Sequence, residues 1–287
     1  MLAMKLKFRS LPVLALLLAV AWAPAVQAQS AGAPYAVPRF RHVDPLAKPP
    51  EVNNLGTIRL LADEDFPPFS YRDSSGALTG FSIATANALC DELKITCQFS
   101  AKPYDALLLA LAAGEADALI AGMRLSPELL EKVDATRPYY RSLGRFAVKR
   151  DSAIAMADES ALQDTRLGAM AGSVHEAYLK AHFEDATLTA YSDMAAAGKA
   201  LQAGEIDAFF ADAAALMFWT LAPASENCCR LAEGAYLDTD SLSPGMSFLV
   251  KRGVTRRKAI LDHGLDRLES SGVQAVIFRR FFPVSPW

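Results

Sequence analysis

The feature that most constrains this chain is an internal repeat. The segment LAAGEADALIA at 111–121 recurs as LQAGEIDAFFA at 201–211, ninety positions later. In both copies a helical pattern ends at a glycine, an acidic residue follows, and a buried strand begins at an Asp-Ala pair. Each copy also follows a strand pattern of its own, ITCQF at 95–99 and ATLTAY at 186–191. The chain therefore encodes one strand-helix-strand unit twice, which predicts two similar α/β lobes.

The segment after the second copy has no counterpart in the repeat. It contains a strand pattern, GMSFLVKR, and then an amphipathic helix. Its most economical place is the first lobe, so the chain crosses between the lobes twice, near 146–151 and near 242–245. Two adjacent crossings make a hinge. We therefore expect an α/β protein of two Rossmann-like lobes with a two-segment hinge. The first lobe comprises 56–147 plus 246–287, and the second comprises 148–245.

Residues 1–28 have the pattern of an export signal. Three basic residues precede an apolar run that ends in small residues at Ala28, where we expect cleavage. The apolar run is shorter than the ~20 residues that a membrane-spanning helix needs. We therefore expect a signal peptide and a protein released into the periplasm. Residues 29–55 are rich in proline and predict an extended linker or arm.

Composition excludes several kinds of partner. Removal of the signal takes away three basic and no acidic residues, which changes the net charge from −3 to −6. An acidic chain argues against nucleic-acid binding, which needs a basic surface. The four histidines are scattered and no CxxC or HxxxH spacing occurs, so no metal is expected. No cofactor motif is present either. His175 and His182, on one helix, are expected to face solvent.

The four cysteines divide into two pairs. Cys90 lies late in a helical pattern and Cys97 lies in the strand that follows. The short loop between them brings the two sulfur atoms within bonding range, so we predict a disulfide. Cys228 and Cys229 are adjacent. They are free, joined to each other, or paired with another chain, and the sequence does not decide between these states.

Several segments carry a resemblance to a known family. They are DFPPFSYRDSSGALTGF, YDALLLALAAGEADALIAGM, SPELLEKVDATRPYY, AGSVHEAYL and IDAFFAD, in this order between Gly56 and Phe282. They resemble the polar-amino-acid family of bacterial periplasmic solute-binding proteins, the receptors of ABC importers. The segment LCDELKITC further resembles the histidine and the lysine/arginine/ornithine binders, which carry a disulfide at that spacing.

The resemblance implies both a fold and a function. The fold is that of a type II periplasmic binding protein, which holds its ligand between two lobes. The function is capture of an amino acid or a related small polar or cationic solute by hinge closure, without chemistry. The expected partners are this solute and, transiently, the permease subunits of an ABC importer in the membrane. We expect a monomer.

Candidate ligand-binding residues in the first lobe follow its strands, because ligands of open α/β sheets bind beyond the carboxyl ends of the strands. Asp63 and Phe66 lie just past the first strand, where a carboxylate can meet a cation and a ring can cover it. Packing in the core is the alternative for Phe66, and a solvated acidic run is the alternative for Asp63. Tyr104 stands where similar proteins present an aromatic ring to the ligand.

Further candidates follow the repeated strands. Gly122, Met123 and Arg124 stand where similar proteins offer backbone groups and a hydroxyl to an amino acid. In the second lobe, Gly172 and Ser173 begin a helix whose free N–H groups suit a carboxylate, although Ser173 is equally a simple N-cap. Asp212 ends a buried strand and matches the acid that binds the ligand's ammonium group in similar proteins.

The sequence departs from the family at one informative position. Leu129 occupies the place of the arginine that grips the ligand's α-carboxylate in similar proteins. Arg124 then either replaces this arginine or points to solvent. In a competing hypothesis the ligand has no α-carboxylate and is chiefly cationic.

Two other functions are compatible with the same architecture. One is an enzyme similar to cyclohexadienyl dehydratase, for which Glu176 is the candidate general acid. The other is a periplasmic sensor that binds a solute but serves no importer.

Overall fold

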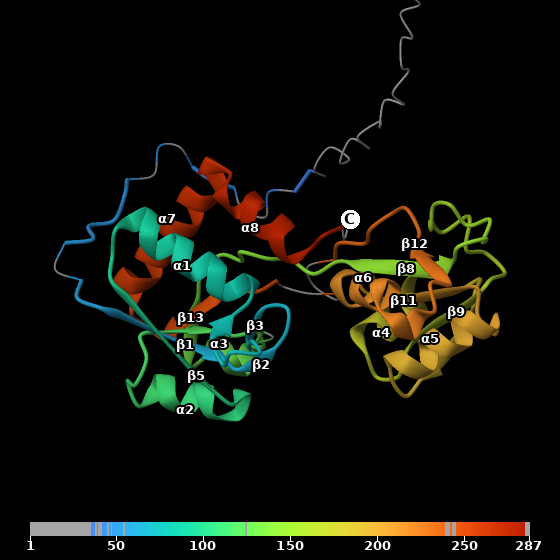
Figure 1. Cartoon of the computed structure of the whole chain (residues 1–287), viewed down its shortest axis with the longest axis horizontal. Coiled ribbons are helices and arrows are strands. Elements are labelled where there is room, and N and C mark those ends of the chain that lie inside the picture. Colours follow the sequence, from blue (N-terminus) through green and yellow to red (C-terminus); the bar gives the residue numbers. More distant parts are fainter. Residues whose placement is uncertain are drawn as a thin grey trace, which may run out of the picture. The chain divides into compact units, whose positions relative to one another are not determined.

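Two five-stranded sheets form the framework of the protein (Figure 1). The computed structural model describes residues 55–123, 125–238 and 245–284, together with residue 242 and parts of the segment 36–53. The predicted signal peptide and Arg124 lie outside these residues. None of the helices in the described ranges combines the length and the hydrophobicity that crossing a bilayer requires.

The first sheet has the strand order β5-β1-β6-β13-β7. Strands β5, β1 and β6 are parallel, whereas β13 runs antiparallel to both of its neighbours. We call the part of the chain around this sheet the first lobe. Its strands are β1 (Ile58–Asp63), β5 (Cys97–Lys102), β6 (Ala118–Ile120), β7 (Val133–Ala135) and β13 (Phe248–Lys251).

The second sheet repeats this arrangement with the strand order β10-β9-β11-β8-β12. Strands β10, β9 and β11 are parallel, and β8 is antiparallel to β11 and β12. We call the part around it the second lobe. Its strands are β8 (Gly144–Lys149), β9 (Arg166–Met170), β10 (Thr187–Tyr191), β11 (Ala208–Asp212) and β12 (Cys229–Leu231). The repeated sequence thus forms β6 and β11 at equivalent places, and the predicted fold class is confirmed.

Helices cover the sheets, and a small third sheet lies next to β1 in sequence. The small sheet consists of β2 (Asp65–Phe66), β3 (Ser70–Arg72) and β4 (Leu78–Thr79). The first lobe carries α1 (Phe81–Leu93), the 3-10 turn η1 (Tyr104–Ala106), α2 (Leu107–Ala112), α3 (Pro127–Leu130), α7 (Thr255–Ser271) and α8 (Val273–Phe281). The second lobe carries α4 (Val174–His182), α5 (Met194–Ala203), α6 (Ala213–Leu221) and the 3-10 turn η2 (Pro223–Ser225).

Local sequence explains where several of these helices begin and end. The side chain of Asp193 accepts a hydrogen bond from the backbone N–H of Ala196 and caps α5. Helix α5 ends at Gly204, which has the left-handed φ of +74° that glycine adopts without strain. Strand β1 is buried along nearly its whole length, as expected for a parallel strand covered on both faces.

A cluster of aromatic rings forms the core of the first lobe. Phe81, Phe278 and Phe282 are fully buried, and their ring centroids lie within 6 Å of one another. Burial of each ring contributes roughly 2–3 kcal/mol to stability. This cluster joins helices α1 and α8, so it fixes the outer helical layer of the first lobe.

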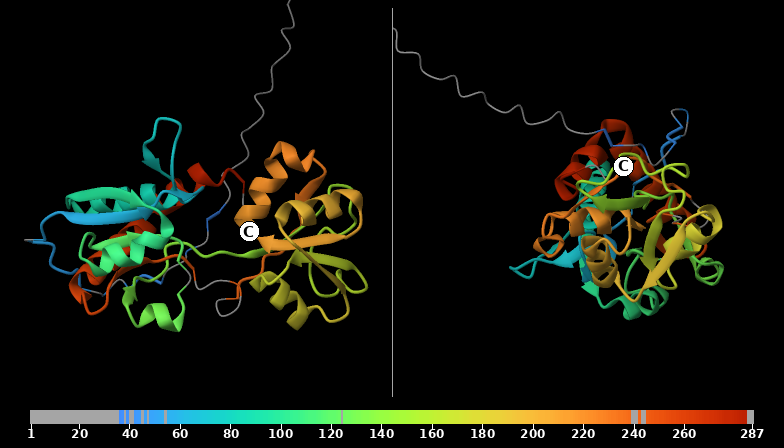
Figure 2. Two further views of the ribbon diagram at one scale, coloured as in Figure 1. Left: turned by 90° about the horizontal axis from the view of Figure 1, so that it is seen from below. Right: turned by 90° about the vertical axis from the view of Figure 1, so that its right-hand side faces the viewer.

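The chain passes between the two sheets twice, in the segment that joins β7 to β8 and in the segment that joins β12 to β13, which we call the first and the second connecting segment (Figure 2). Tyr140 forms an isolated β-bridge with Met246, and Gly144 forms another with Tyr236. Strand β8 pairs with β11 from Gly144 onward, so the predicted lobe boundary at residue 147 falls within a strand of the second sheet. The division into lobes at the predicted residue numbers stays a prediction.

All four cysteines are paired. The disulfide predicted between Cys90 and Cys97 is present, with a Cα–Cα distance of 6.2 Å, and it links α1 to β5. Cys228 and Cys229 are joined to each other at the start of β12. Of the three states that the sequence left open for the adjacent pair, the structure therefore has the intramolecular ring.

Candidate functional site

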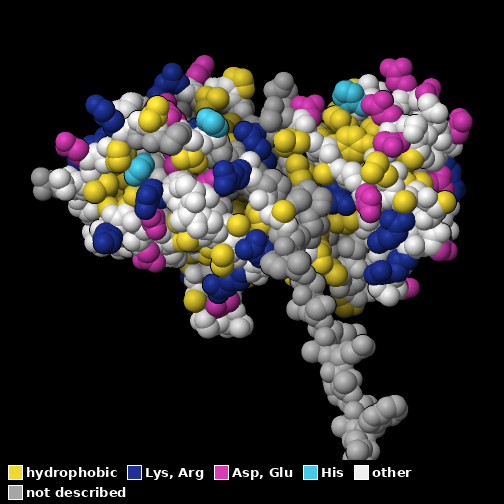
Figure 3. All heavy atoms as spheres, turned by 90° about the horizontal axis from the view of Figure 1, so that it is seen from above, with side chains coloured by type: hydrophobic (Ala, Val, Ile, Leu, Met, Phe, Trp, Pro, Cys, Tyr) yellow, Lys and Arg dark blue, Asp and Glu magenta, His cyan; other side chains and the backbone are white. Residues whose placement is uncertain are grey.

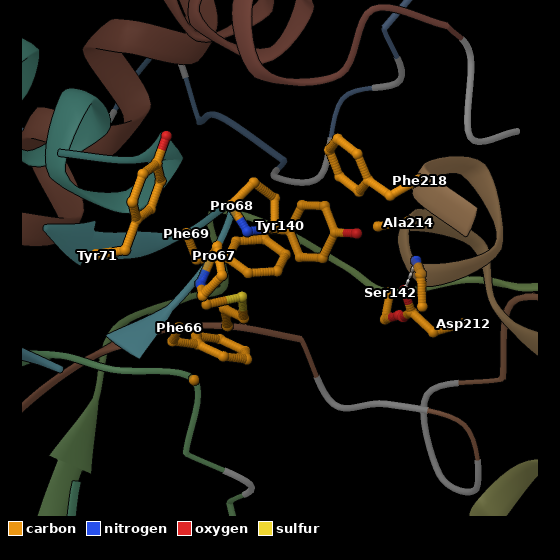
Figure 4. A pocket seen from close by; sticks show the side chains of 13 residues that line it. Phe66, Pro67, Pro68, Phe69, Tyr71, Tyr140, Ser142, Asp212, Ala214 and Phe218 are labelled. Atoms are coloured by element: carbon orange, nitrogen blue, oxygen red, sulfur yellow. Dashed lines mark hydrogen bonds between the residues drawn. The ribbon is translucent and has the colours of Figure 1, made fainter. Parts of the chain in front are cut away.

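A pocket of about 770 Å³ is lined by residues of both lobes and of the segments that connect them (Figure 4). Aromatic rings and prolines dominate its wall, and the one charged side chain among the described lining residues is a carboxylate. The lining residues are Phe66, Pro67, Pro68, Phe69, Tyr71, Gly122, Tyr140, Ser142, Asp212, Ala214, Ala215, Phe218 and Met246. Such a wall favours a solute with an apolar or planar body and a positive group.

Phe66 and Gly122 form the wall that the first lobe contributes. The ring of Phe66 is half-buried and stacks on Phe69 with a centroid distance of 5.0 Å. A Cβ atom on Gly122 would lie 2.3 Å from Cε1 of Phe66. Glycine is therefore the residue that lets this ring approach the backbone just after β6.

Asp212 lies at the carboxyl end of β11 and at the start of α6. Its Oδ1 accepts a hydrogen bond from the backbone N–H of Ala215 at 3.0 Å, which caps the helix. Burial raises the pKa of Asp212 above its ordinary value, against the hydrogen bonds from the helix N-terminus. Among the described residues no cation lies within ion-pair distance of this carboxylate. A positive group in the pocket would relieve the unfavourable burial of its charge.

Tyr140 and Ser142 belong to the segment between β7 and β8 and line the pocket together with Asp212 (Figure 4). Tyr140 is buried, and its hydroxyl points toward the second lobe. Burial and the charge of Asp212 raise the pKa of Tyr140 well above its ordinary value. The hydroxyl thus stays protonated and can donate a hydrogen bond in the pocket.

Helix α6 supplies a ring that sequence reasoning missed. Phe218 is 37% exposed and lines the pocket together with Ala214 and Ala215, which lie four and three residues before it. Residues at these spacings share one face of a helix. The sequence signal that could have predicted this ring is the position of α6, which begins directly after the strand that ends at Asp212.

Other predicted site residues of the first lobe do not line this pocket. Asp63 is buried at the end of β1, where its carboxylate accepts a hydrogen bond from the N–H of Asp65. Tyr104 begins η1 and is 52% exposed. Met123 is buried in the core cluster between α2 and the sheet, and Leu129 packs against the same cluster.

Gly172 and Ser173 form the N-terminus of α4 outside the pocket lining. The Ser173 hydroxyl accepts a hydrogen bond from the N–H of Glu176, and the Glu176 carboxylate accepts one from the N–H of Gly172. This arrangement resembles a capping box, but the bond to the Glu176 carboxylate comes from the residue before the N-cap and not from the N-cap itself. The structure thus shows the capping role of Ser173, and its contact with a ligand stays a prediction.

The candidate general acid, Glu176, is engaged in hydrogen bonds at the N-terminus of α4. Glu176 forms a hydrogen bond with Lys180, and this bond and the one from Gly172 lower the pKa of Glu176. A general acid needs a raised pKa, so Glu176 is poorly suited to that role. Within the described ranges no group of three or more His, Cys, Asp or Glu side chains is placed to hold a metal ion.

Comparison with known proteins gives one family for the globular part. The model of the bacterial extracellular solute-binding proteins, family 3, matches residues 58–284. The L-arginine-binding protein of Pseudomonas aeruginosa is 26% identical over 78% of this chain and 87% of its own length. The lysine/arginine/ornithine-binding periplasmic protein of Escherichia coli is 23% identical over 79% of this chain and 87% of its own length.

A solved structure shows the same fold. The L-cystine solute receptor of Neisseria gonorrhoeae, in its unliganded open conformation, superposes with a TM-score of 0.70. The match covers 80% of this chain and 94% of the receptor at 22% identity. The family and the two-lobed fold predicted from the sequence are both confirmed.

Proposed function

Because this chain belongs to family 3 of the bacterial extracellular solute-binding proteins, we propose that it captures a small cationic solute, an amino acid or a related amine, for an ABC importer. Its relatives include binding proteins for arginine, lysine, ornithine and histidine, which supports a cationic ligand. Because these relatives are binding proteins, they also support a role in solute binding over an enzymatic or purely sensory role. The periplasm is the compartment of these relatives. The proposal also includes transient contact with permease subunits, export by a cleaved signal and a monomeric state.

The observation that carries the proposal is the position of Asp212. Its carboxylate lies in a pocket whose wall includes the rings of Phe66, Tyr140 and Phe218. A cation there gains an ion pair with the carboxylate and cation–π contacts with the rings, each worth about 0.5–2 kcal/mol. A solute without a positively charged group gains neither interaction.

Hinge closure is the proposed mechanism. Residues lining the pocket belong to both lobes, and the two connecting segments are bridged at Tyr140 and Met246. A solute that contacts both lobes stabilises the closed arrangement by its additional contacts there. Closure also excludes water from the Asp212 carboxylate, which strengthens the ion pair.

Isothermal titration calorimetry with a panel of solutes tests the proposal. L-Arginine, L-lysine and L-histidine represent cationic amino acids, agmatine represents an amine without a carboxylate, and L-glutamine and L-glutamate are the controls. We expect binding among the first four and none for L-glutamate. Binding of L-glutamate or L-glutamine alone would refute the preference for a cation. Turnover of prephenate or arogenate would refute the assignment as a binding protein.

The pair L-arginine and agmatine also tests the sequence hypothesis for Arg124. The two solutes differ by the α-carboxylate. If Arg124 binds this group, Arg124→Ala weakens L-arginine binding by about 1.5–3 kcal/mol and leaves agmatine binding unchanged. If the true ligand is an amine, the wild-type protein binds agmatine at least as tightly as L-arginine, and Arg124→Ala changes neither affinity.

A further inference from the structure

The two lobes also meet through an aromatic contact outside the connecting segments. The ring of Phe218 in α6 and the ring of Phe282 after α8 have centroids 6.3 Å apart and planes tilted by 47°. Helix α6 packs on β8, β11 and β12 of the second lobe, whereas α8 packs on α1 and α7 of the first lobe. The contact therefore joins the lobes directly, at a point far in sequence from both crossings.

Phe282 is held firmly on the side of the first lobe. It is fully buried, and its ring stacks on Tyr140 at 5.7 Å with an interplanar angle of 12°. A second stacked contact, at 4.3 Å, joins it to Phe278. Aromatic pairs of this kind contribute beyond the area that they bury. Phe218, in contrast, is 37% exposed, so its position depends on the few groups that it contacts.

Phe282 also lies directly behind residues that line the pocket. Its ring contacts Phe69, Tyr140 and Phe218, and all three of these residues line the pocket. Helix α6, which bears Phe218, packs against the same cluster, because Ala214 and Met217 are buried in the cluster that contains Phe282. One side chain thus supports rings that the two lobes present to the same cavity.

We propose that Phe282 is a positioning residue for the ligand site. It holds Phe218 and the first turns of α6 against the first lobe, and it thereby sets the distance between the aromatic rings on the two sides of the pocket. This inference rests on the proposed function for its effect on affinity. Its effect on the lobes is independent of any ligand.

Phe282→Leu is the test variant and Phe278→Leu is its matched control. Both phenylalanines are fully buried in one cluster and are four residues apart. Within the described part of the chain, Phe278 has ring contacts with Phe81, Tyr140 and Phe282 but not with Phe218. Both variants are expected to lower the melting temperature to a similar extent. Only Phe282→Leu should alter the distribution of distances between the two lobes.

Pulsed electron spin resonance on ligand-free protein measures the distance between spin labels placed in the two lobes. Leu109 in α2 and Lys199 in α5 are exposed and lie in different lobes. All four native cysteines are in disulfides, so Leu109→Cys and Lys199→Cys supply the two thiols for spin labels. We expect Phe282→Leu to broaden the distribution of distances between the labels, and Phe278→Leu to leave it as in the wild type. The same distribution in all three proteins would overturn the proposal.

Calorimetry with L-arginine as the probe measures the effect on the site. The dissociation constant should rise about tenfold in Phe282→Leu and less than twofold in Phe278→Leu, since a lost aromatic pair is worth about a factor of ten at most. An unchanged or lower dissociation constant in Phe282→Leu would overturn the positioning role. If the wild type binds no solute of the panel, the proposed function fails, and the distance measurement still decides whether Phe282 holds the lobes.

Discussion

Asp117 and Asp207 hold equivalent positions in the two lobes, and each carboxylate accepts three hydrogen bonds from one arginine. Asp117 accepts them from the backbone N, Nε and Nη2 of Arg59 at the start of the first lobe. Asp207 accepts them from the same three atoms of Arg166 in the second lobe. Each aspartate is the Asp of the repeated Asp-Ala pair. The repeat therefore preserves an ion pair that joins the beginning of β1 to the beginning of β6 in the first lobe, and the beginning of β9 to the beginning of β11 in the second lobe.

The two ion pairs are expected to differ in strength because their burial differs. The side chain of Asp117 is 4% exposed and also pairs with Arg257 at 3.2 Å, whereas that of Asp207 is 36% exposed. We expect Asp117→Ala to lower the free energy of unfolding by about 3 kcal/mol and Asp207→Ala by about 1 kcal/mol. Urea unfolding of both variants checks this order, and equal losses would contradict it.

Replacement of Asp212 by asparagine is expected to separate binding from stability. Asparagine still caps α6, and it removes a carboxylate whose pKa is raised by burial. Because a raised pKa means that the folded state disfavours the charge, stability at pH 7 should stay equal or rise. Binding of a cationic solute should weaken by about a factor of 100, corresponding to about 3 kcal/mol.

Asp193→Asn is the matched control for this variant. Asp193 caps α5 by the same kind of bond, from the N–H of Ala196, but it is exposed and outside the pocket. Hydrogen bonds lower the pKa of Asp193, so its loss should reduce stability slightly and leave ligand affinity unchanged. Undiminished binding in Asp212→Asn would refute the role of this carboxylate.

His175 is expected to make stability depend on pH. Burial lowers its pKa to about 4, and its ring packs edge-on against Phe210. The folded state therefore binds a proton more weakly than the unfolded state. The stability that His175 contributes is complete above pH 6.5 and is lost as the pH falls toward 4, by about 2 kcal/mol for this half-buried ring.

Urea unfolding at pH 7.5 and 4.5 measures this contribution. His175→Gln should lose less stability between the two values than the wild type. His182, seven residues later and exposed, provides the control, since His182→Gln should behave as the wild type does. An identical loss in His175→Gln and the wild type would show that other groups cause the pH dependence.

Addition of a methyl group at Gly122 is expected to reshape the pocket. The new Cβ would lie 2.3 Å from the ring of Phe66, so the ring must move. Gly122→Ala should lower the free energy of unfolding by about 1 kcal/mol and weaken solute binding about tenfold. Combination with Phe66→Ala removes the obstacle, so the double variant should be as stable as Phe66→Ala. Additive losses of stability would mean that the two positions are independent.

The sequence predicted the fold well because its signals were local and occurred twice. The glycine after each repeated helix and the buried run after each Asp-Ala pair suffice to place β6 and β11. Strand ends then pointed to Asp212 and Gly122, since the carboxyl ends of parallel strands gather at one edge of a sheet. Both residues line the pocket.

Other aspects of the site depend on packing that no local pattern records. Helix α6 is apolar at every position except Thr220, so its sequence does not show that Phe218 faces the pocket. Met123 directly follows Gly122, and successive residues of an extended segment point to opposite sides, which places Met123 in the core. The expectation that His175 faces solvent was wrong, because α4 turns this residue onto Phe210 of the sheet.

The face that α6 presents to the cavity has a consequence for how this receptor acquires new specificities. This short helix is capped by the carboxylate of Asp212 and carries the ring of Phe218 at the pocket. It also packs, through Ala214 and Met217, against the cluster that contains Phe282. A substitution on this helix is therefore expected to alter ligand recognition and the balance between open and closed forms together. Descendants that change ligand are expected to change positions 218 and 282 as a pair, and such covariation would be visible in an alignment of closely related receptors.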